Sequence, residues 1–147
     1  MSVAPVAKIL TLVVLLSAVL HLIWENAQAP LFVGYQSFWQ HFWICLQAIP
    51  GDVVVTLLIY FLVAAWHRNV RWIERIGFPE LAVVSIAGAA TAVGLERYAL
   101  GVGRWAYAPA MPLLPGLEVG LLPVLQMAVV PALTFLFTAK LQRPITT

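Results

Sequence analysis

The chain alternates between long apolar runs and short polar or turn-rich stretches. A run of about 20 apolar residues is long enough for a helix to cross the roughly 30 Å hydrocarbon core of a bilayer. Polar or turn-forming residues follow each run, so the runs are separate helices rather than one continuous element. The pattern predicts four membrane-spanning helices, over residues 7–29, 52–66, 80–100 and 117–139.

One further stretch, residues 35–47, is too short and too mixed to span a bilayer. Written on a helix, it places Tyr35, Trp39 and Trp43 on one arc and mostly polar side chains on the other. Aromatic side chains are typical of the membrane–water interface, so this pattern predicts an amphipathic interfacial helix. The alternative is a helix with a purely structural role that caps the bundle. The predicted fold is an all-α integral membrane four-helix bundle with one additional interfacial helix, in a single domain over residues 1–147.

Two of the connections carry turn chemistry. Pro50-Gly51-Asp52 favours a turn in which Asp52 is the N-cap of the second spanning helix. Residues 101–116, GVGRWAYAPAMPLLPG, are dense in glycine, proline and aromatic residues. This composition predicts an ordered, non-helical loop between the last two helices.

Composition agrees with a polytopic membrane protein. Hydrophobic residues make up 63% of the chain and charged residues only 10%, whereas about a quarter of a soluble domain is charged. Ala27-Gln28-Ala29 imitates a signal-peptide cleavage site, but the first apolar run continues to this point, so we expect a retained helix. The net charge of +2 gives no reason to expect a nucleic-acid partner. The single cysteine, Cys45, excludes an internal disulfide and a paired-cysteine redox motif.

The basic residues indicate how the chain is oriented. Lysine and arginine are concentrated in cytoplasmic loops of membrane proteins. Only Arg97 and Arg104 fall on the side opposite the majority in a four-helix topology. We therefore predict that both termini are cytoplasmic, as in a bacterial inner (plasma) membrane protein. The basic residues that share the cytoplasmic side are Lys8, Arg68, Arg71, Arg75, Lys140 and Arg143.

Polar side chains fall where lipid is expected, at the far end of the first apolar run. Ser17, His21, Glu25 and Gln28 occupy a narrow sector of one helical face. A carboxylate at membrane depth is costly, so it normally faces other helices or a wet cavity and suggests a functional site.

Two other predicted helices bring carboxylates to the same outer third of the bundle, which makes an acid–base site there a reasonable hypothesis. We predict four catalytic residues: His21, Glu25, Asp52 and Glu96. The predicted substrate-binding residues are Gln28, His41, Tyr60, Arg97, Arg104, Trp105, Tyr107 and Gln126.

Structural roles are the alternative for each of these groups. Glu25 can pair with Arg97 or Arg104, Asp52 can act only as a cap, and Glu96 can sit among lipid headgroups. His21 can be a packing histidine that is hydrogen-bonded to Ser17 or to a neighbouring helix. His21 and Glu25, four residues apart, could share a metal, but the chain has no His-x-x-His, no Glu-x-x-His and no cysteine cluster. We therefore predict no metal site, and the sequence identifies no cofactor.

A resemblance bears on the class of substrate. Glu96 ends an apolar helix and is followed by GRWAYAPAMPLLPG and a further apolar helix to Met127. This segment resembles the interhelical loops of carotenoid-modifying membrane proteins related to the small lycopene cyclases. The resemblance implies an isoprenoid or similar hydrophobic substrate.

Three functions are compatible with these features. The first is an intramembrane enzyme or binding protein for a lipid-like or isoprenoid molecule that uses carboxylate and histidine chemistry. The second is an accessory subunit that packs against a larger membrane complex, with the polar stripe joining helices. The third is a proton, ion or metal conductor formed by oligomerisation. The expected partners are the lipid bilayer, a hydrophobic small molecule, and a second copy or a larger complex.

Overall fold

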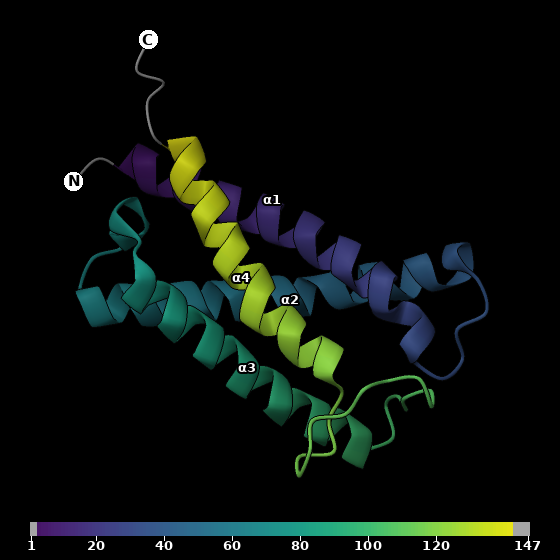
Figure 1. Ribbon diagram of the computed structural model, residues 1–147. Coiled ribbons are helices and arrows are strands. Elements are labelled where there is room, and N and C mark those ends of the chain that lie inside the picture. Colours follow the sequence, from purple (N-terminus) through teal and green to yellow (C-terminus); the bar gives the residue numbers. More distant parts are fainter. Residues whose placement is uncertain (1–2, 143–147) are drawn as a thin grey trace.

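A computed structural model describes residues 3–142 of the chain, and it is built from four long α-helices (Figure 1). All four are long and apolar enough to cross a membrane, so the predicted all-α, integral membrane four-helix fold is confirmed. Two short 3-10 helices, η1 and η2, lie in the connections. The elements are α1 (Val3–Gln28), η1 (Ala29–Leu31), α2 (Phe38–His67), η2 (Trp72–Arg75), α3 (Phe78–Gly101) and α4 (Leu121–Gln142).

The second helix differs most from the prediction. Residues 35–47 and 52–66 do not form an interfacial helix and a separate spanning helix, because α2 runs without interruption from Phe38 to His67. Ser37, not Asp52, is its N-cap and accepts a hydrogen bond from the backbone nitrogen of Gln40. Pro50 lies inside the helix. A proline is tolerated there because a chain in lipid must satisfy its backbone groups internally, which favours a helix over an open turn.

The length of α2 explains why its first turns have an interfacial composition. Its 30 residues correspond to about 45 Å at 1.5 Å per residue, which exceeds the roughly 30 Å hydrocarbon core. Trp39 and Trp43, two of the aromatic side chains predicted for the interface, are on these turns and are largely exposed, whereas Tyr35 precedes the helix. The interfacial character is therefore retained within a spanning helix.

The last helix begins later than predicted, at Leu121 instead of residue 117. Leu113 and Gly120 form an isolated β-bridge, and Glu118 has a positive φ of 54°, so the chain is still in a loop at these residues. Pro123 consequently lies in the first turn of α4, where its missing N–H costs nothing.

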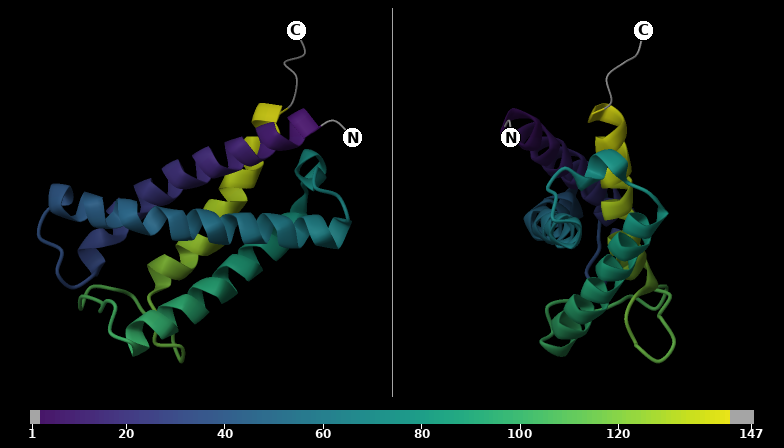
Figure 2. Two further views of the ribbon diagram at one scale, coloured as in Figure 1. Left: turned by 180° about the vertical axis from the view of Figure 1, so that it is seen from behind. Right: turned by 90° about the vertical axis from the view of Figure 1, so that its left-hand side faces the viewer.

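The four helices run up and down, so both connections α1–α2 and α3–α4 lie at one end of the bundle, here called the loop end (Figures 1 and 2). The first turn of α1, η2 and the last turn of α4 lie at the opposite end. Helix α3 packs mainly on α4, and α1 packs on α2 and α4, whereas α2 and α3 make less contact. Lys140 lies at the end that also holds the η2 segment, and Arg143 lies outside the described residues.

The end opposite the loops holds a dry apolar core. Tyr60 and Phe135 are fully buried there, and Trp72 of η2 packs against both rings. The Trp72 indole donates a hydrogen bond to the Tyr60 carbonyl oxygen at 3.1 Å, and the Tyr60 hydroxyl donates to the Val70 carbonyl. These bonds fix the loop between α2 and α3 beneath the bundle. The buried members of this core are Ile9, Val13, Ile59, Tyr60, Val63, Ala64, Trp72, Ile73, Val84, Phe135 and Ala139.

A close backbone contact joins α3 to α4 midway along the bundle. Pro131 has no N–H, so the Met127 carbonyl four residues earlier lacks its usual intrahelical partner. Gly88 of α3 faces that carbonyl so closely that a Cβ atom built on Gly88 would stand 1.9 Å from the Met127 oxygen. The hydrogen that glycine carries in this position points at the unpaired oxygen, as in the Cα–H···O contacts of closely packed helices. This contact fixes how closely α3 approaches α4.

The two connections at the loop end pair with each other. Phe32, after η1, forms an isolated antiparallel bridge with Tyr107, and the Val33 nitrogen donates to the Ala106 carbonyl at 2.9 Å. Residues 102–120 contain no helix, which confirms the predicted non-helical loop over most of its length. The paired connections close the loop end over the helix termini.

Candidate functional site

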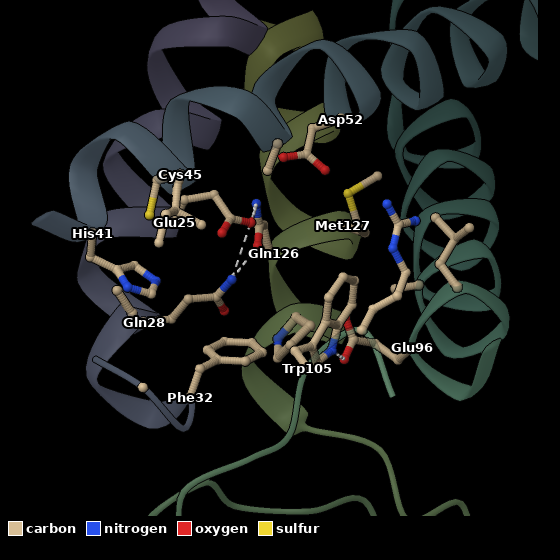
Figure 3. Close-up of a pocket in the computed structure, with 18 of the residues that line it drawn as sticks. Glu25, Gln28, Phe32, His41, Cys45, Asp52, Glu96, Trp105, Gln126 and Met127 are labelled. Atoms are coloured by element: carbon tan, nitrogen blue, oxygen red, sulfur yellow. Dashed lines mark hydrogen bonds between the residues drawn. The ribbon is translucent and has the colours of Figure 1, made fainter. Parts of the chain in front are cut away.

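A cavity of about 470 Å³ opens between the four helices beneath the paired connections (Figure 3). Every helix contributes to its wall: α1 with Glu25, α2 with Asp52, α3 with Glu96 and α4 with Gln126. The three carboxylates therefore come from three different helices, as predicted. Much of the remaining wall is apolar or aromatic: Ala29, Phe32, Val33, Ile44, Cys45, Ala48, Ala92, Leu95, Trp105, Pro123 and Met127.

A chain of side-chain amides holds Glu25 in place. The Gln126 nitrogen donates to Glu25 Oε1 at 2.9 Å and to His21 Nδ1 at 3.0 Å. The Gln28 nitrogen donates to the same Glu25 oxygen at 3.2 Å and to Gln126 Oε1 at 2.7 Å. Each amide nitrogen thus uses both of its hydrogens, and the Glu25 oxygen accepts two. The network joins α1 to α4 and fixes the position of the carboxylate.

The Nε2 atom of His21 is hydrogen-bonded to the hydroxyl of Thr56, which also contacts Ser17. Thr56 donates its only hydroxyl hydrogen to the Asp52 carbonyl, one turn earlier in α2, at 2.9 Å. Its oxygen therefore acts as acceptor toward both Ser17, at 3.1 Å, and His21 Nε2, at 3.2 Å. With the proton on Nε2, Nδ1 of a neutral imidazole is left to accept from Gln126, in agreement with the amide network. The hydrogen-bond pattern assigns the tautomer of His21.

Asp52 lies between His21 and the cavity. Its Oδ2 is 3.8 Å from His21 Nδ1, too far for a hydrogen bond. This oxygen is buried and has no hydrogen-bond partner in the structure. Asp52 belongs to the middle of α2, so the prediction that it caps a helix is wrong.

Glu96 ties the outer loop to α3. Its Oε2 accepts hydrogen bonds from the Trp105 indole, at 3.2 Å, and from the Tyr107 hydroxyl. Burial, and then the bond to the Glu96 carboxylate, raise the pKa of Tyr107, so its hydroxyl remains a donor. Phe32 packs edge-on against both rings. Glu96 is 8% exposed, so its side chain is largely enclosed by protein.

No lysine or arginine lies within 4.0 Å of a carboxylate of Glu25, Asp52 or Glu96 among residues 3–142. The alternative in which Glu25 pairs with Arg97 or Arg104 is therefore not what the structure contains. Within the same residues, no three His, Cys, Asp or Glu side chains are close enough together to form a metal site.

Most of the predicted site residues come together. Gln28, His41, Arg104, Trp105 and Gln126 line the cavity beside the three carboxylates. His21 does not line it and is joined to Glu25 through the side-chain amide of Gln126. Tyr107 reaches the site through Glu96.

Two predicted substrate-binding residues are elsewhere. Tyr60 is part of the apolar core at the opposite end of the bundle, and Arg97 is exposed and does not line the cavity. Tyr60 is one helical turn from Thr56 and Arg97 is next to Glu96, so sequence spacing alone groups them with the residues around the cavity.

Comparison of the chain with protein-family models, with curated proteins and with solved structures found no match.

Three of the residues at or beside the cavity that are absent from the predicted site show what a local pattern misses. Thr56 lies one helical turn from both Asp52 and Tyr60 in the sequence, but this spacing does not reveal that it positions His21. Phe32 is apolar and follows a proline-containing break, so nothing in its local pattern distinguishes it. Cys45 is buried at the cavity wall, and a single cysteine among aromatic residues gives no local signal of that position.

Proposed function

We propose that this protein is an intramembrane enzyme or binding protein for a lipid-like or isoprenoid molecule. The observation that carries the proposal is the cavity in which Glu25, Asp52 and Glu96 meet without a lysine or arginine partner in the described residues. Uncompensated carboxylates at membrane depth are costly, and helix packing alone gives no reason to keep three of them around one space.

The wall of the cavity supports a hydrophobic occupant. A site for an amphiphile combines an apolar surface with a few fixed polar groups. Here Phe32, Ile44, Leu95 and Met127 provide apolar surface beside the amide-held carboxylate of Glu25. The resemblance of residues 96–127 to carotenoid-modifying proteins is in line with an isoprenoid chain.

Glu25 is the proposed proton donor or acceptor. Two amide nitrogens fix its Oε1, and positioning of this kind is what general acid–base catalysis requires. His21 and Gln126 position Glu25, while Asp52 and Glu96 complete the polar wall. Trp105 and Arg104 lie on the loop side of the cavity, where the outer end of the substrate would be held.

The orientation follows the charges. We propose that the loop end faces outward and that both termini are cytoplasmic, in a bacterial inner membrane. The loop connecting α2 and α3 carries Arg68, Arg71 and Arg75 at the opposite end of the bundle. Reporter fusions at the C-terminus and in the loop of residues 102–120 test this assignment, with cytoplasmic signal expected only for the former.

Conduction through a single chain has less support. The polar line of the cavity ends at Ser17 and Thr56, and beyond them the bundle is filled by the apolar core around Tyr60 and Phe135. Such a core offers an ion no polar path, so transport would have to run between copies of the chain.

Native mass spectrometry of the gently extracted protein tests the proposed function. Wild type should carry a hydrophobic small molecule, and Glu25→Gln should lose most of it. Glu118→Gln is the matched control, because Glu118 is exposed in the outer loop and does not line the cavity. If wild type and Glu25→Gln are both empty and equally stable, the proposal fails. A co-purifying partner chain in place of a small molecule would favour the accessory-subunit function.

A further inference from the structure

Two buried acceptors at the cavity wall lack a donor. Gln28 is 4% exposed and lines the cavity, and its Oε1 makes no hydrogen bond although its nitrogen makes two. Asp52 Oδ2 is likewise buried without a partner. Figure 3 shows the Gln28 amide and the Asp52 carboxyl on different sides of the same space. Buried acceptors are normally satisfied, so this site is built to receive a donor.

The charges at the cavity wall also favour a ligand that donates, and in particular a cation. Glu25, Asp52 and Glu96 line the cavity, and Arg104, which is exposed in the outer loop, is the one lysine or arginine among its lining residues. Charged groups in a membrane interior are retained when they pair with an opposite charge. No lysine or arginine of the described residues lies within 4.0 Å of these carboxylates, so a cation seated between them would be a closer partner than Arg104.

We propose that the polar end of the bound molecule is a protonated amine, carried on an apolar chain. This inference rests on the proposed function, because it names the class of molecule that the same cavity would take. An ammonium group has three hydrogens to donate. Gln28 Oε1 or Asp52 Oδ2 can accept one of them, and the Glu25 carboxylate provides the opposite charge. An alkylamine is protonated at neutral pH, as lysine is.

Other headgroups match the site less well. A sulfate or phosphate ester brings negative charge and further acceptors to a wall that already has three carboxylates. An alcohol has one donor hydrogen and no charge. A quaternary ammonium has the charge and can lie against the rings of Phe32 and Trp105, but it has no hydrogen to donate to Gln28 or Asp52. Binding affinities of four amphiphiles that share one chain length and differ only in headgroup therefore distinguish the contribution of charge from that of hydrogen bonding.

Methionine-methyl NMR measures the binding of these amphiphiles in the cavity and does not require the natural ligand to be known. The chain has three methionines. Met127 lines the cavity, whereas Met111 is buried against Gly120 and does not line it, so Met111 is an internal control. The protein, labelled with ¹³C at the methionine methyl groups, is placed in lipid nanodiscs and titrated with dodecylamine, dodecanol, dodecyltrimethylammonium or dodecyl sulfate. Signals are assigned with Met127→Leu and Met111→Leu.

Dodecylamine should shift the Met127 signal saturably and leave Met111 in place. Its apparent affinity should exceed that of the other three amphiphiles by about tenfold or more, since a charge-assisted hydrogen bond contributes roughly that much. Asp52→Asn should lower the apparent affinity for dodecylamine by a similar factor and leave the affinity for dodecanol nearly unchanged. Glu118→Gln should behave as wild type.

Equal affinity for dodecanol and dodecylamine would overturn the inference but leave a cavity that binds lipid-like molecules. Tighter binding of dodecyltrimethylammonium or dodecyl sulfate would overturn it as well, because the donor hydrogens or the positive charge would then be unnecessary. If none of the four moves Met127, the inference and the proposed function both fail.

Discussion

The side-chain nitrogen of Gln126 on α4 lies 2.9 Å from Glu25 Oε1 on α1, although the two residues are 101 positions apart in the chain. The same nitrogen lies 3.0 Å from His21 Nδ1. One amide therefore sets the position of a carboxylate and the tautomer of a histidine. Because Gln126 is 2% exposed, both bonds are protected from competition with water.

Replacing Gln126 should loosen the contact between α1 and α4. In Gln126→Leu, the side chains of Glu25, His21 and Gln28 each lose a partner and remain buried or half-buried. We expect a loss of about 1–3 kcal/mol in the free energy of unfolding. Thermal denaturation in detergent measures it, with Leu125→Ala, on the more exposed side of the same turn, as the control. A stability equal to that of wild type would show that the amide network does not hold these helices together.

Gly88→Ala should be strongly destabilising, because its methyl group would meet the Met127 carbonyl oxygen at 1.9 Å. Overpacking of this kind typically costs about 1–3 kcal/mol. Gly94→Ala on the same helix is a matched control, since nothing lies within 4 Å of its added Cβ. There the substitution should stabilise α3 slightly, by about 0.5–1 kcal/mol. Opposite signs are expected for the two variants in the same denaturation assay, and equal effects would contradict the packing described.

The outer loop should open when Glu96 is removed. Glu96→Leu deletes the acceptor of the Trp105 indole and the Tyr107 hydroxyl. Hydrogen bonds to a carboxylate contribute roughly 1.5–3 kcal/mol each, so the open form of the loop should become about tenfold more populated or more. Arg104 is the one trypsin site between residues 101 and 120, and its cleavage rate reports on the opening. The cleavage rate of Glu96→Gln, which keeps an acceptor, should lie between the rates of wild type and Glu96→Leu. A Glu96→Leu cleavage rate equal to that of wild type would exclude an anchoring role for Glu96.

Much of the site follows from helical periodicity and topology. Ser17, His21, Glu25 and Gln28 share one helix, and a period of 3.6 residues places them on one face whatever surrounds them. Glu25 and Glu96 lie near the ends of α1 and α3, and an up-and-down bundle brings these ends to one side, as predicted. Asp52 reaches the same cavity from the middle of α2, not from a helix end.

The remaining features depend on interactions that a local pattern does not contain. The bond between Gln28 and Gln126 is set by how α1 crosses α4, which no single segment encodes. Pro50-Gly51 has the chemistry of a turn, yet α2 continues through it, because the membrane environment penalises an open backbone more than a proline. Tyr60 belongs to a polar stripe by spacing, but its ring completes the apolar core and its hydroxyl bonds to Val70.

The tautomer of His21 is a further prediction. The Thr56 hydroxyl donates its hydrogen bond to the backbone carbonyl of Asp52, so its oxygen can only accept from His21. Neutral His21 should therefore carry its proton on Nε2. In ¹⁵N NMR of histidine-labelled protein, the Nε2 of His21 should resonate as a protonated nitrogen and Nδ1 as an unprotonated acceptor. Thr56→Val removes the acceptor and should redistribute the proton between the two nitrogens. Finding the proton on Nδ1 in wild type would reverse the donor and acceptor roles assigned to Gln126.

The most direct test of the central claim is to fill the cavity without changing its charged groups. Ala48 lines the cavity and is itself exposed, so Ala48→Trp should occupy the space of the bound molecule with little effect on helix packing. Leu58→Trp, at a 63% exposed position on the same helix, is the control. In native mass spectra, wild type and Leu58→Trp should carry the same small molecule and Ala48→Trp should be empty. If Ala48→Trp retains the molecule at full occupancy, it is bound elsewhere, and the cavity at Glu25 is not the site.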